Sequence, residues 1–168
     1  MKKIRVVGTG IKGIKHITLE AVNNFSNCKK TLLFFPQNEL IKYFEKNNLP
    51  YDDITSLYVN GNEDMSNYTS LLNRIFEEVS LNDDIVFCLP GHPRFGVTLI
   101  KLLNTRANQN NIKLTVTLGL SSFDTMLDDI ELDPIEQGAA TLDANLMILL
   151  DYNMEPRINY FLYHICSI

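Results

Sequence analysis

The chain has 168 residues, of which 45% are apolar and 21% charged, and this composition excludes both a disordered chain and a membrane-spanning one. A formal charge of −5 disfavours a nucleic-acid partner, because proteins that bind the phosphate backbone usually carry a basic face. The cysteines Cys28, Cys88 and Cys166 lack zinc-ligand spacing, so we expect reduced thiols in a cytoplasmic protein. We expect neither a secretory signal nor a membrane span, because the apolar runs are short and interrupted by charges.

Short apolar, β-branched runs alternate with segments of helical periodicity, and this alternation predicts an α/β fold with a mostly parallel sheet flanked by helices. Reading from the N-terminus, we expect strands at 4–7, 31–35, 53–59, 85–89, 112–118 and 158–165. Helices are expected between them at 18–25, 39–46, 71–79, 97–103 and 122–130. The polar stretch 61–67 is expected to be a loop, and the pattern leaves the apolar segment 141–150 open between helix and strand.

A glycine-rich loop follows the first predicted strand. Residues 8–13 read GTGIKG, which has the GxGxxG spacing of a dinucleotide-binding turn. That motif also needs an acidic residue near the end of the second strand to bind the ribose, and here the strand ends Phe34-Phe35-Pro36. We therefore disfavour a nicotinamide or flavin site. The alternative is a tight turn at a strand end, where another group can approach the backbone closely.

The strand at 85–89 is followed by Pro90-Gly91-His92-Pro93. Glycine permits close approach and the prolines stiffen the loop, so this segment suits a pocket wall that recognises its ligand through main-chain groups, although an ordinary turn is an equal alternative. A base or metal-ligand role for His92 is also open. We expect no metal site, because the three histidines are far apart and lack a carboxylate or cysteine at ligand spacing.

A third loop, Gly119-Leu120-Ser121-Ser122, follows the strand at 112–118. A nucleophilic serine of the GxSxG type would need glycine where Phe123 stands. The two serines either cap the next helix or offer its N-terminus to a polar ligand group. Because the carboxyl ends of parallel strands meet at one end of a sheet, the loops at Gly8, Gly91 and Gly119 are predicted to line one cleft for a small polar ligand.

Together these loops resemble those of the class III S-adenosylmethionine-dependent methyltransferases, the tetrapyrrole methylase superfamily. The matching segments are residues 6–21 (VVGTGIKGIKHITLEA), 89–96 (LPGHPRFG) and 118–134 (LGLSSFDTMLDDIELDP). The sequence is most similar to the borosin-type peptide backbone N-methyltransferases. These enzymes share a last pattern of an Asp-Pro pair followed by spaced Gly, Thr and Ala residues. In this sequence the corresponding residues are Asp133-Pro134, Gly138, Thr141 and Ala144.

The resemblance implies an S-adenosylmethionine cofactor and a peptide or small-molecule acceptor, usually in a homodimer. It implies cofactor contacts from Pro90, Gly91, His92, Pro93, Phe95, Ser121 and Ser122, with His164 near the position of a family glutamine. It places Gly8, Gly10, Gly13 and His16 on the acceptor side. Tyr58 and Tyr68 match the family's catalytic tyrosines, and core packing is an equal alternative for both.

The sequence also departs from the family. Residues 61–67 hold no counterpart of the arginine that borosin enzymes carry between the tyrosines, Arg94 replaces a glycine, and no proline precedes Gly119. Family members have two lobes, so the resemblance implies an N-terminal α/β lobe at 1–118 and the beginning of a second lobe at 119–168. The expected function is a methyltransferase. The alternative is a shortened, non-catalytic homologue that binds a ligand or partner.

Overall fold

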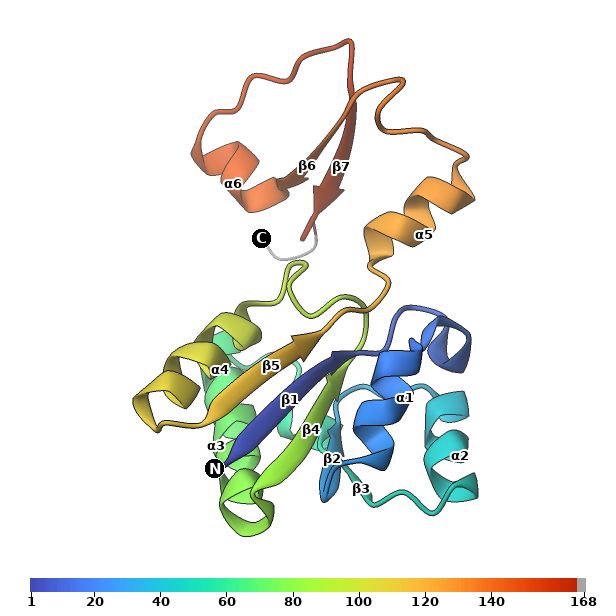
Figure 1. The fold of residues 1–168 in the computed structure, drawn as a ribbon. Coiled ribbons are helices and arrows are strands. Elements are labelled where there is room, and N and C mark those ends of the chain that lie inside the picture. The colour runs from blue at the N-terminus through green and yellow to red at the C-terminus, as the bar shows by residue number, and fades with distance from the viewer. Residues whose placement is uncertain (166–168) are drawn as a thin grey trace. The chain divides into compact units, whose positions relative to one another are not determined.

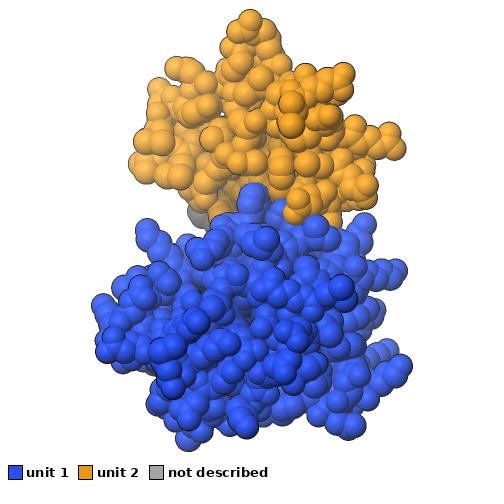
Figure 2. Space-filling view, in the orientation of Figure 1, with its two compact units in different colours: residues 1–122 blue, residues 123–168 orange. Residues whose placement is uncertain are grey.

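The computed structural model describes residues 1–165 and contains two compact units, Met1–Ser122 and Phe123–Ile168 (Figure 2). The prediction for Cys166 lies outside the described residues. Within the described part of the chain, no helix combines the length and apolarity needed to cross a membrane.

The unit Met1–Ser122 is a five-stranded, all-parallel sheet covered by helices (Figure 1), which confirms the predicted α/β class. Across the sheet the strands follow the order β3-β2-β4-β1-β5. The strands are β1 Lys3–Gly8, β2 Lys30–Leu33, β3 Tyr51–Asp53, β4 Asp84–Leu89 and β5 Lys113–Thr117. The α-helices are α1 Leu19–Ser26, α2 Asn38–Lys46, α3 Asp64–Asn82 and α4 Thr98–Gln109, and the short 3₁₀ helices are η1 Gly13–His16 and η2 Thr55–Leu57.

Two apolar layers enclose the sheet because strand side chains alternate between its faces. On β1, Ile4 and Val6 join the layer built with α3 and α4, whereas Val7 joins the layer built with α1 and α2. The predicted apolar face of α3 is confirmed, because its five members are buried: Leu71, Leu72, Ile75, Phe76 and Val79. Helices α1 and α2 therefore cover one face and α3 and α4 the other.

Two predicted elements near the middle of the chain were wrong. The strand expected at 53–59 is instead the end of β3 followed by η2, because the Asp53 carboxylate accepts a hydrogen bond from the Thr55 N–H at 2.9 Å. Such a local side-chain contact competes with the strand ladder and turns the chain. The loop expected at 61–67 gives way to α3 at Asp64, because the start of this helix is mostly polar and its apolar periodicity is apparent only from Leu71 onward.

The unit Phe123–Ile168 contains a parallel pair of strands, β6 Ala139–Asp143 and β7 Asn159–Tyr163, with the helices α5 Ser122–Asp129 and α6 Ala144–Leu149. The segment left open at 141–150 is thus part strand and part helix. The change occurs at Asp143, whose carboxylate accepts hydrogen bonds from the backbone N–H groups of Asn145 and Leu146 at 2.9 and 3.1 Å. An aspartate N-cap of this kind starts a helix directly after a strand.

Candidate functional site

The chain reverses its winding direction between β1 and β4. The helices that follow β1 and β2 cover one face of the sheet, and those that follow β3 and β4 cover the other, while β1 and β4 are neighbours (Figure 1). The loops leaving these two strands therefore diverge to opposite faces. In open parallel sheets, this switch point at the carboxyl ends of the strands is where ligands bind.

The loops of β1 and β4 are joined at the switch point by their main chains. The Gly91 N–H donates to the Gly10 carbonyl at 2.9 Å, and the Gly10 N–H returns a longer hydrogen bond of 3.4 Å. Both glycines have positive φ angles, 68° at Gly10 and 72° at Gly91, which few other residues adopt. The glycines that the sequence singled out are therefore needed for this loop-to-loop bridge.

The third loop reaches the same point. A methyl group added at Gly119 would lie 2.5 Å from the Gly91 carbonyl oxygen and 2.9 Å from Gly8 Cα. One added at Gly8 would overlap the same carbonyl oxygen and lie 2.6 Å from Pro93 Cδ. The structure thus brings Gly8, Gly91 and Gly119 into backbone contact, as their positions at three strand ends predicted.

Side chains hold the first loop in shape. The Nδ1 atom of His16 accepts hydrogen bonds from the backbone N–H groups of Ile11 and Lys12, both at 3.3 Å. Gln37, which the sequence reasoning missed, donates from Nε2 to the Ile11 carbonyl, and its Oε1 would lie 2.5 Å from a methyl group at Gly13. No sequence signal marks Gln37, because its contact crosses from the start of α2 to a loop 26 residues earlier. His16 and Gln37 therefore act as supports for the glycine loop.

The loop after β4 is a compact turn. His92 Nδ1 accepts from the Arg94 N–H at 3.1 Å, and the His92 carbonyl accepts from the Phe95 N–H at 3.0 Å. Gly91 and Pro93 are buried, whereas Pro90 is exposed. A hollow of about 230 Å³ lies beside this turn, lined by Pro93, Arg94, Val97, Ile100, Lys101 and Asn104. The His92 ring thus has a turn-forming partner, and its role toward a cofactor stays a prediction.

One carboxylate acts on both predicted catalytic tyrosines. Tyr58 directly follows η2, and its hydroxyl donates to Asp64 Oδ1 at 2.9 Å. This hydrogen bond to a carboxylate raises the pKa of Tyr58, and burial followed by the charge of Asp64 raises the pKa of Tyr68. Both tyrosines also pack against the apolar layer of α3. Asp64 was not anticipated, because the sequence placed it in a loop.

The remaining predicted residues lie at and beyond the boundary of the first unit. Ser121 is buried and Ser122 half-buried. His164 lies in the second unit, where its Nδ1 is 2.6 Å from Asp143 Oδ2. Within residues 1–165 there is no group of three or more His, Cys, Asp or Glu side chains that could hold a metal ion.

The Asp143–His164 pair predicts an acid-sensitive second unit. The hydrogen bond from His164, followed by those from the α6 backbone, holds the pKa of Asp143 below its ordinary value of 3.8. A carboxyl group whose pKa is lower in the folded state than in the unfolded state stabilises the fold at pH values above its unfolded-state pKa. This stabilisation is lost as the pH falls through the folded-state pKa. We expect Asp143→Asn to reduce the loss of β6–α6 amide protection that occurs as the pH falls below about 4, measured by hydrogen exchange. Asp151→Asn, an exposed change nearby, should leave the wild-type pH dependence intact; an equal effect would contradict this role.

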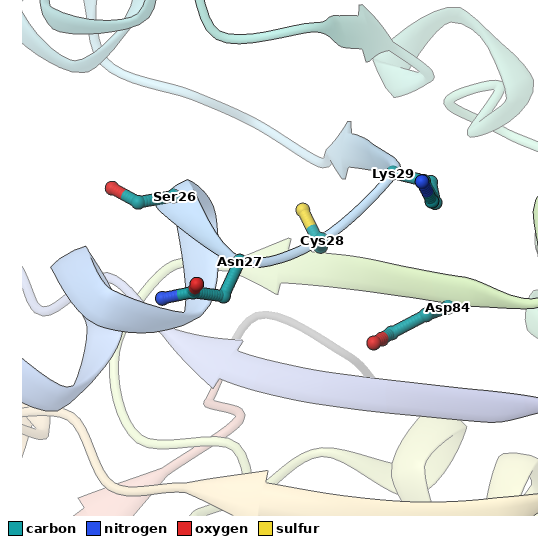
Figure 3. A pocket seen from close by; sticks show the side chains of 5 residues that line it. All are labelled: Ser26, Asn27, Cys28, Lys29 and Asp84. Carbon is teal, nitrogen blue, oxygen red and sulfur yellow. The ribbon is translucent and has the colours of Figure 1, made fainter.

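A second hollow, of about 250 Å³, lies at the opposite, amino end of the sheet (Figure 3). Its lining residues are Ser26, Asn27, Cys28, Lys29 and Asp84. Asp84 pairs with the buried Arg5 guanidinium at 2.5 Å, and Arg5 also donates to the Asn27 carbonyl at 2.8 Å. Burial raises the pKa of the Cys28 thiol, which keeps it protonated at neutral pH. These contacts connect the amino-terminal parts of β1 and β4 and the segment before β2, so we assign them a role in stabilising the sheet.

Comparisons with known proteins agree with the predicted resemblance. No protein-family model matches the sequence. The chain is 25% identical over 145 residues to the uncharacterized protein YabN of Bacillus subtilis, a match that covers 86% of this chain and 29% of that protein. It is 22% identical over 162 residues to the methyltransferase/ribosomally synthesized cyclic peptide gymnopeptides precursor of Gymnopus fusipes, covering 96% of this chain and 39% of the precursor. The chain thus spans less than half the length of these curated relatives.

Solved structures share the fold at low identity. The uroporphyrin-III-C-methyltransferase of Thermus thermophilus matches with a TM-score of 0.64 and 14% identity, over 85% of this chain and 60% of that enzyme. A putative cobalamin-synthesis-related protein of Corynebacterium diphtheriae matches with a TM-score of 0.66 and 14% identity, over 96% of this chain and 71% of that protein. The chain therefore has the fold of the tetrapyrrole methyltransferases and resembles in sequence the methyltransferase/cyclic peptide precursors of the borosin type.

Proposed function

We propose that this chain takes part in S-adenosylmethionine-dependent methyl transfer to the backbone amide of a peptide, or to another small acceptor. The observation that carries the proposal is the switch point between β1 and β4, where the loops of Gly8, Gly91 and Gly119 touch through their main chains. The fold of known methyltransferases and the similarity to methyltransferase/cyclic peptide precursors support it.

The residues at the switch point fit such a cofactor. S-adenosylmethionine joins an apolar-faced adenine ring to a polar ribose and amino-acid group. At the switch point the main-chain groups of Gly91 and the His92 carbonyl are hydrogen-bonded within the loops, which gives the backbone a fixed shape. Leu118 and Leu120 expose 61% and 41% of their surface beside Gly119 and offer apolar contacts. A methyl group at Gly91 would meet only Ile11 Cδ1, at 3.6 Å, so the space at the side-chain position of this glycine is open. We propose cofactor contacts from Pro90, Gly91, His92, Pro93 and Phe95, together with Ser121, Ser122 and His164.

The residues of the chain would mainly position the reactants. When bound, S-adenosylmethionine supplies a methyl group activated by a sulfonium sulfur. The bridged loops fix the backbone that would hold the cofactor, and Gly8, Gly10, Gly13 and His16 would border the acceptor. Alignment of two reactants in a near-attack geometry can account for much of the rate enhancement of a direct displacement. A peptide amide must also lose a proton, for which Tyr58 and Tyr68 are the proposed catalytic residues.

Cofactor binding is the direct test. We expect titration calorimetry to show saturable binding of S-adenosylhomocysteine and S-adenosylmethionine to the folded chain. Gly91→Ala should weaken this binding about tenfold, because alanine at a φ of 72° costs about 1–2 kcal/mol and distorts the loop. Gly61→Ala imposes similar backbone strain, at a φ of 88° with nothing within 4 Å, and should bind normally. Absence of binding by the folded wild-type chain would exclude the proposed function.

Three further assignments are part of this proposal. Residues 1–118 would form the N-terminal lobe and residues 119–168 the beginning of a second lobe. The protein would act as a homodimer in the cytoplasm. Size-exclusion chromatography with light scattering should then give twice the chain mass of 19.2 kDa, and a monomer at all concentrations would exclude the dimer.

A further inference from the structure

Asp64 lies in the segment 61–67, which contains no basic residue that could pair with Tyr58 or Tyr68. It is the first residue of α3, and it accepts the hydrogen bond of the Tyr58 hydroxyl at 2.9 Å. Among residues 1–165, Asp64 forms no ion pair with a lysine, arginine or histidine. Its charge therefore acts on the two tyrosines without an opposing cation, and both phenols respond to it.

The segment that carries this pair is fixed from both sides. Asn67 is 2% exposed, and its side chain accepts from the Val59 N–H at 3.0 Å and donates to the Val59 carbonyl at 3.1 Å. This double hydrogen bond locks the chain after Tyr58 to the first turn of α3. A buried amide with both groups paired is costly to move. The Tyr58–Asp64 hydrogen bond is itself exposed, but the backbone beside it is held in place by this buried contact.

Aromatic rings fix the Tyr58 side chain toward the carboxyl ends of the strands. The ring centroids of Phe34 and Phe35 both lie 6.0 Å from that of Tyr58. The Phe34 N–H donates to the Cys88 carbonyl at 3.0 Å, which ties this cluster to β4 close to the switch point. Phe35 has a φ of 50°, a strained value for a bulky residue, and strain of this kind is concentrated at functional sites.

We propose that Tyr58 and Asp64 form a proton relay that accepts the proton of the acceptor nitrogen during methyl transfer. This inference rests on the proposed function. Tyr58 would touch the acceptor and is the catalytic residue, whereas Asp64 acts through Tyr58 and is a positioning residue. A cationic partner would stabilise a tyrosinate. In the relay, Asp64 instead accepts the proton that the Tyr58 phenol gives up.

The step balances in atoms and charge. The acceptor N–H bond breaks, its proton binds Tyr58 Oη, and the Tyr58 proton moves to Asp64 Oδ1. The electron pair of the nitrogen forms the new N–CH₃ bond, and the pair of the broken S–CH₃ bond stays on sulfur. One carboxylate charge and one sulfonium charge disappear together. The step therefore creates no new pair of separated charges.

The groups facing Tyr58 agree with a relay and not with a preformed base. They are Asp64 and Tyr68 from α3, the polar Asn67, and the apolar rings of Phe34 and Phe35. Because the hydrogen-bonded carboxylate raises the pKa of Tyr58, the phenol stays protonated at neutral pH. A protonated phenol can accept a proton only if it gives up its own, and Asp64 is within reach to take it.

The test compares Tyr58→Phe and Asp64→Asn with the control Glu63→Gln. Glu63 is the neighbouring exposed carboxylate, and its side chain does not cap α3. The assay follows methyl transfer from S-adenosylmethionine to a pool of unstructured peptides by mass spectrometry. We expect Tyr58→Phe and Asp64→Asn to lower kcat on the order of 100-fold with little change in KM, since general base catalysis contributes at least that much. Glu63→Gln should stay within about twofold.

The pH profile separates a relay from a structural role. Without Asp64 the pKa of Tyr58 falls toward its ordinary value, so the tyrosinate fraction at a given pH increases. Asp64→Asn should therefore regain activity as the pH rises from 8 toward 10, by about tenfold per pH unit, whereas Tyr58→Phe should not. In the apoprotein, tyrosinate absorbance should begin to rise at lower pH in Asp64→Asn than in the wild type and Glu63→Gln, because the pKa values of both Tyr58 and Tyr68 are raised by Asp64.

The outcomes distinguish the relay from the proposed function. Wild-type turnover in Asp64→Asn, equal losses in Asp64→Asn and Glu63→Gln, or an unchanged tyrosinate titration would overturn the relay and leave methyl transfer in place. Cofactor binding by the wild type without transfer to any peptide would overturn the peptide acceptor and the relay with it. Failure of the wild type to bind the cofactor would overturn the proposed function itself.

Discussion

Gly8→Ala and Gly119→Ala should each destabilise the first unit by about 3 kcal/mol or more, at or above the upper end for overpacking. The methyl group added by Gly8→Ala would overlap the Gly91 carbonyl, and the one added by Gly119→Ala would lie 2.5 Å from the same oxygen. The obstructing atoms are backbone, so no side-chain rotation relieves the clash. Because Trp is absent, far-UV circular dichroism in urea is the suitable measurement of unfolding.

The same substitutions should abolish cofactor binding, even in any fraction that folds, because relief of the clash requires the three loops to separate. Gly61→Ala serves as the matched control, since its methyl group meets nothing within 4 Å. It should lose only about 1–2 kcal/mol from its positive φ. Wild-type stability in Gly8→Ala and Gly119→Ala would show that the three loops do not meet at the switch point.

Asp84→Asn should destabilise the first unit by about 3 kcal/mol, the lower end for removal of one member of a buried ion pair. Arg5 has only 10% of its side chain exposed, so its charge would lose its carboxylate partner while staying buried. The hydrogen bonds from Arg5 to the Asn24 side chain and the Asn27 carbonyl would remain, which limits the loss. Asp84 itself is 32% exposed, and this places the expected effect near the lower limit.

Asp83→Asn is the control for this prediction. Asp83 is exposed, and its φ of 60° is one that asparagine tolerates, so the substitution removes a neighbouring charge without changing the buried pair. We expect less than about 0.5 kcal/mol from Asp83→Asn in the same urea titration. Equal effects of the two substitutions would indicate a general charge effect and refute a specific role of the Arg5–Asp84 pair.

The candidate site divides into parts that sequence could predict and parts that it could not. Gly8, Gly91 and Gly119 were predictable, because each closely follows an apolar strand and the carboxyl ends of parallel strands share one end of the sheet. Gln37 and Asp64 were not predictable. Gln37 supports the glycine loop across 26 residues, and Asp64 stands in an exposed polar turn without periodicity.

The sequence by itself determined the α/β class, the parallel strands and the glycine loops, because hydrophobic period and turn residues are local properties of the chain. Only the tertiary structure decided the order β3-β2-β4-β1-β5, and with it the meeting of the β1 and β4 loops at the switch point. It also decided that Asp64 hydrogen-bonds Tyr58. Strand neighbours and side-chain pairs of this kind depend on packing between segments distant in the chain, which no local pattern records.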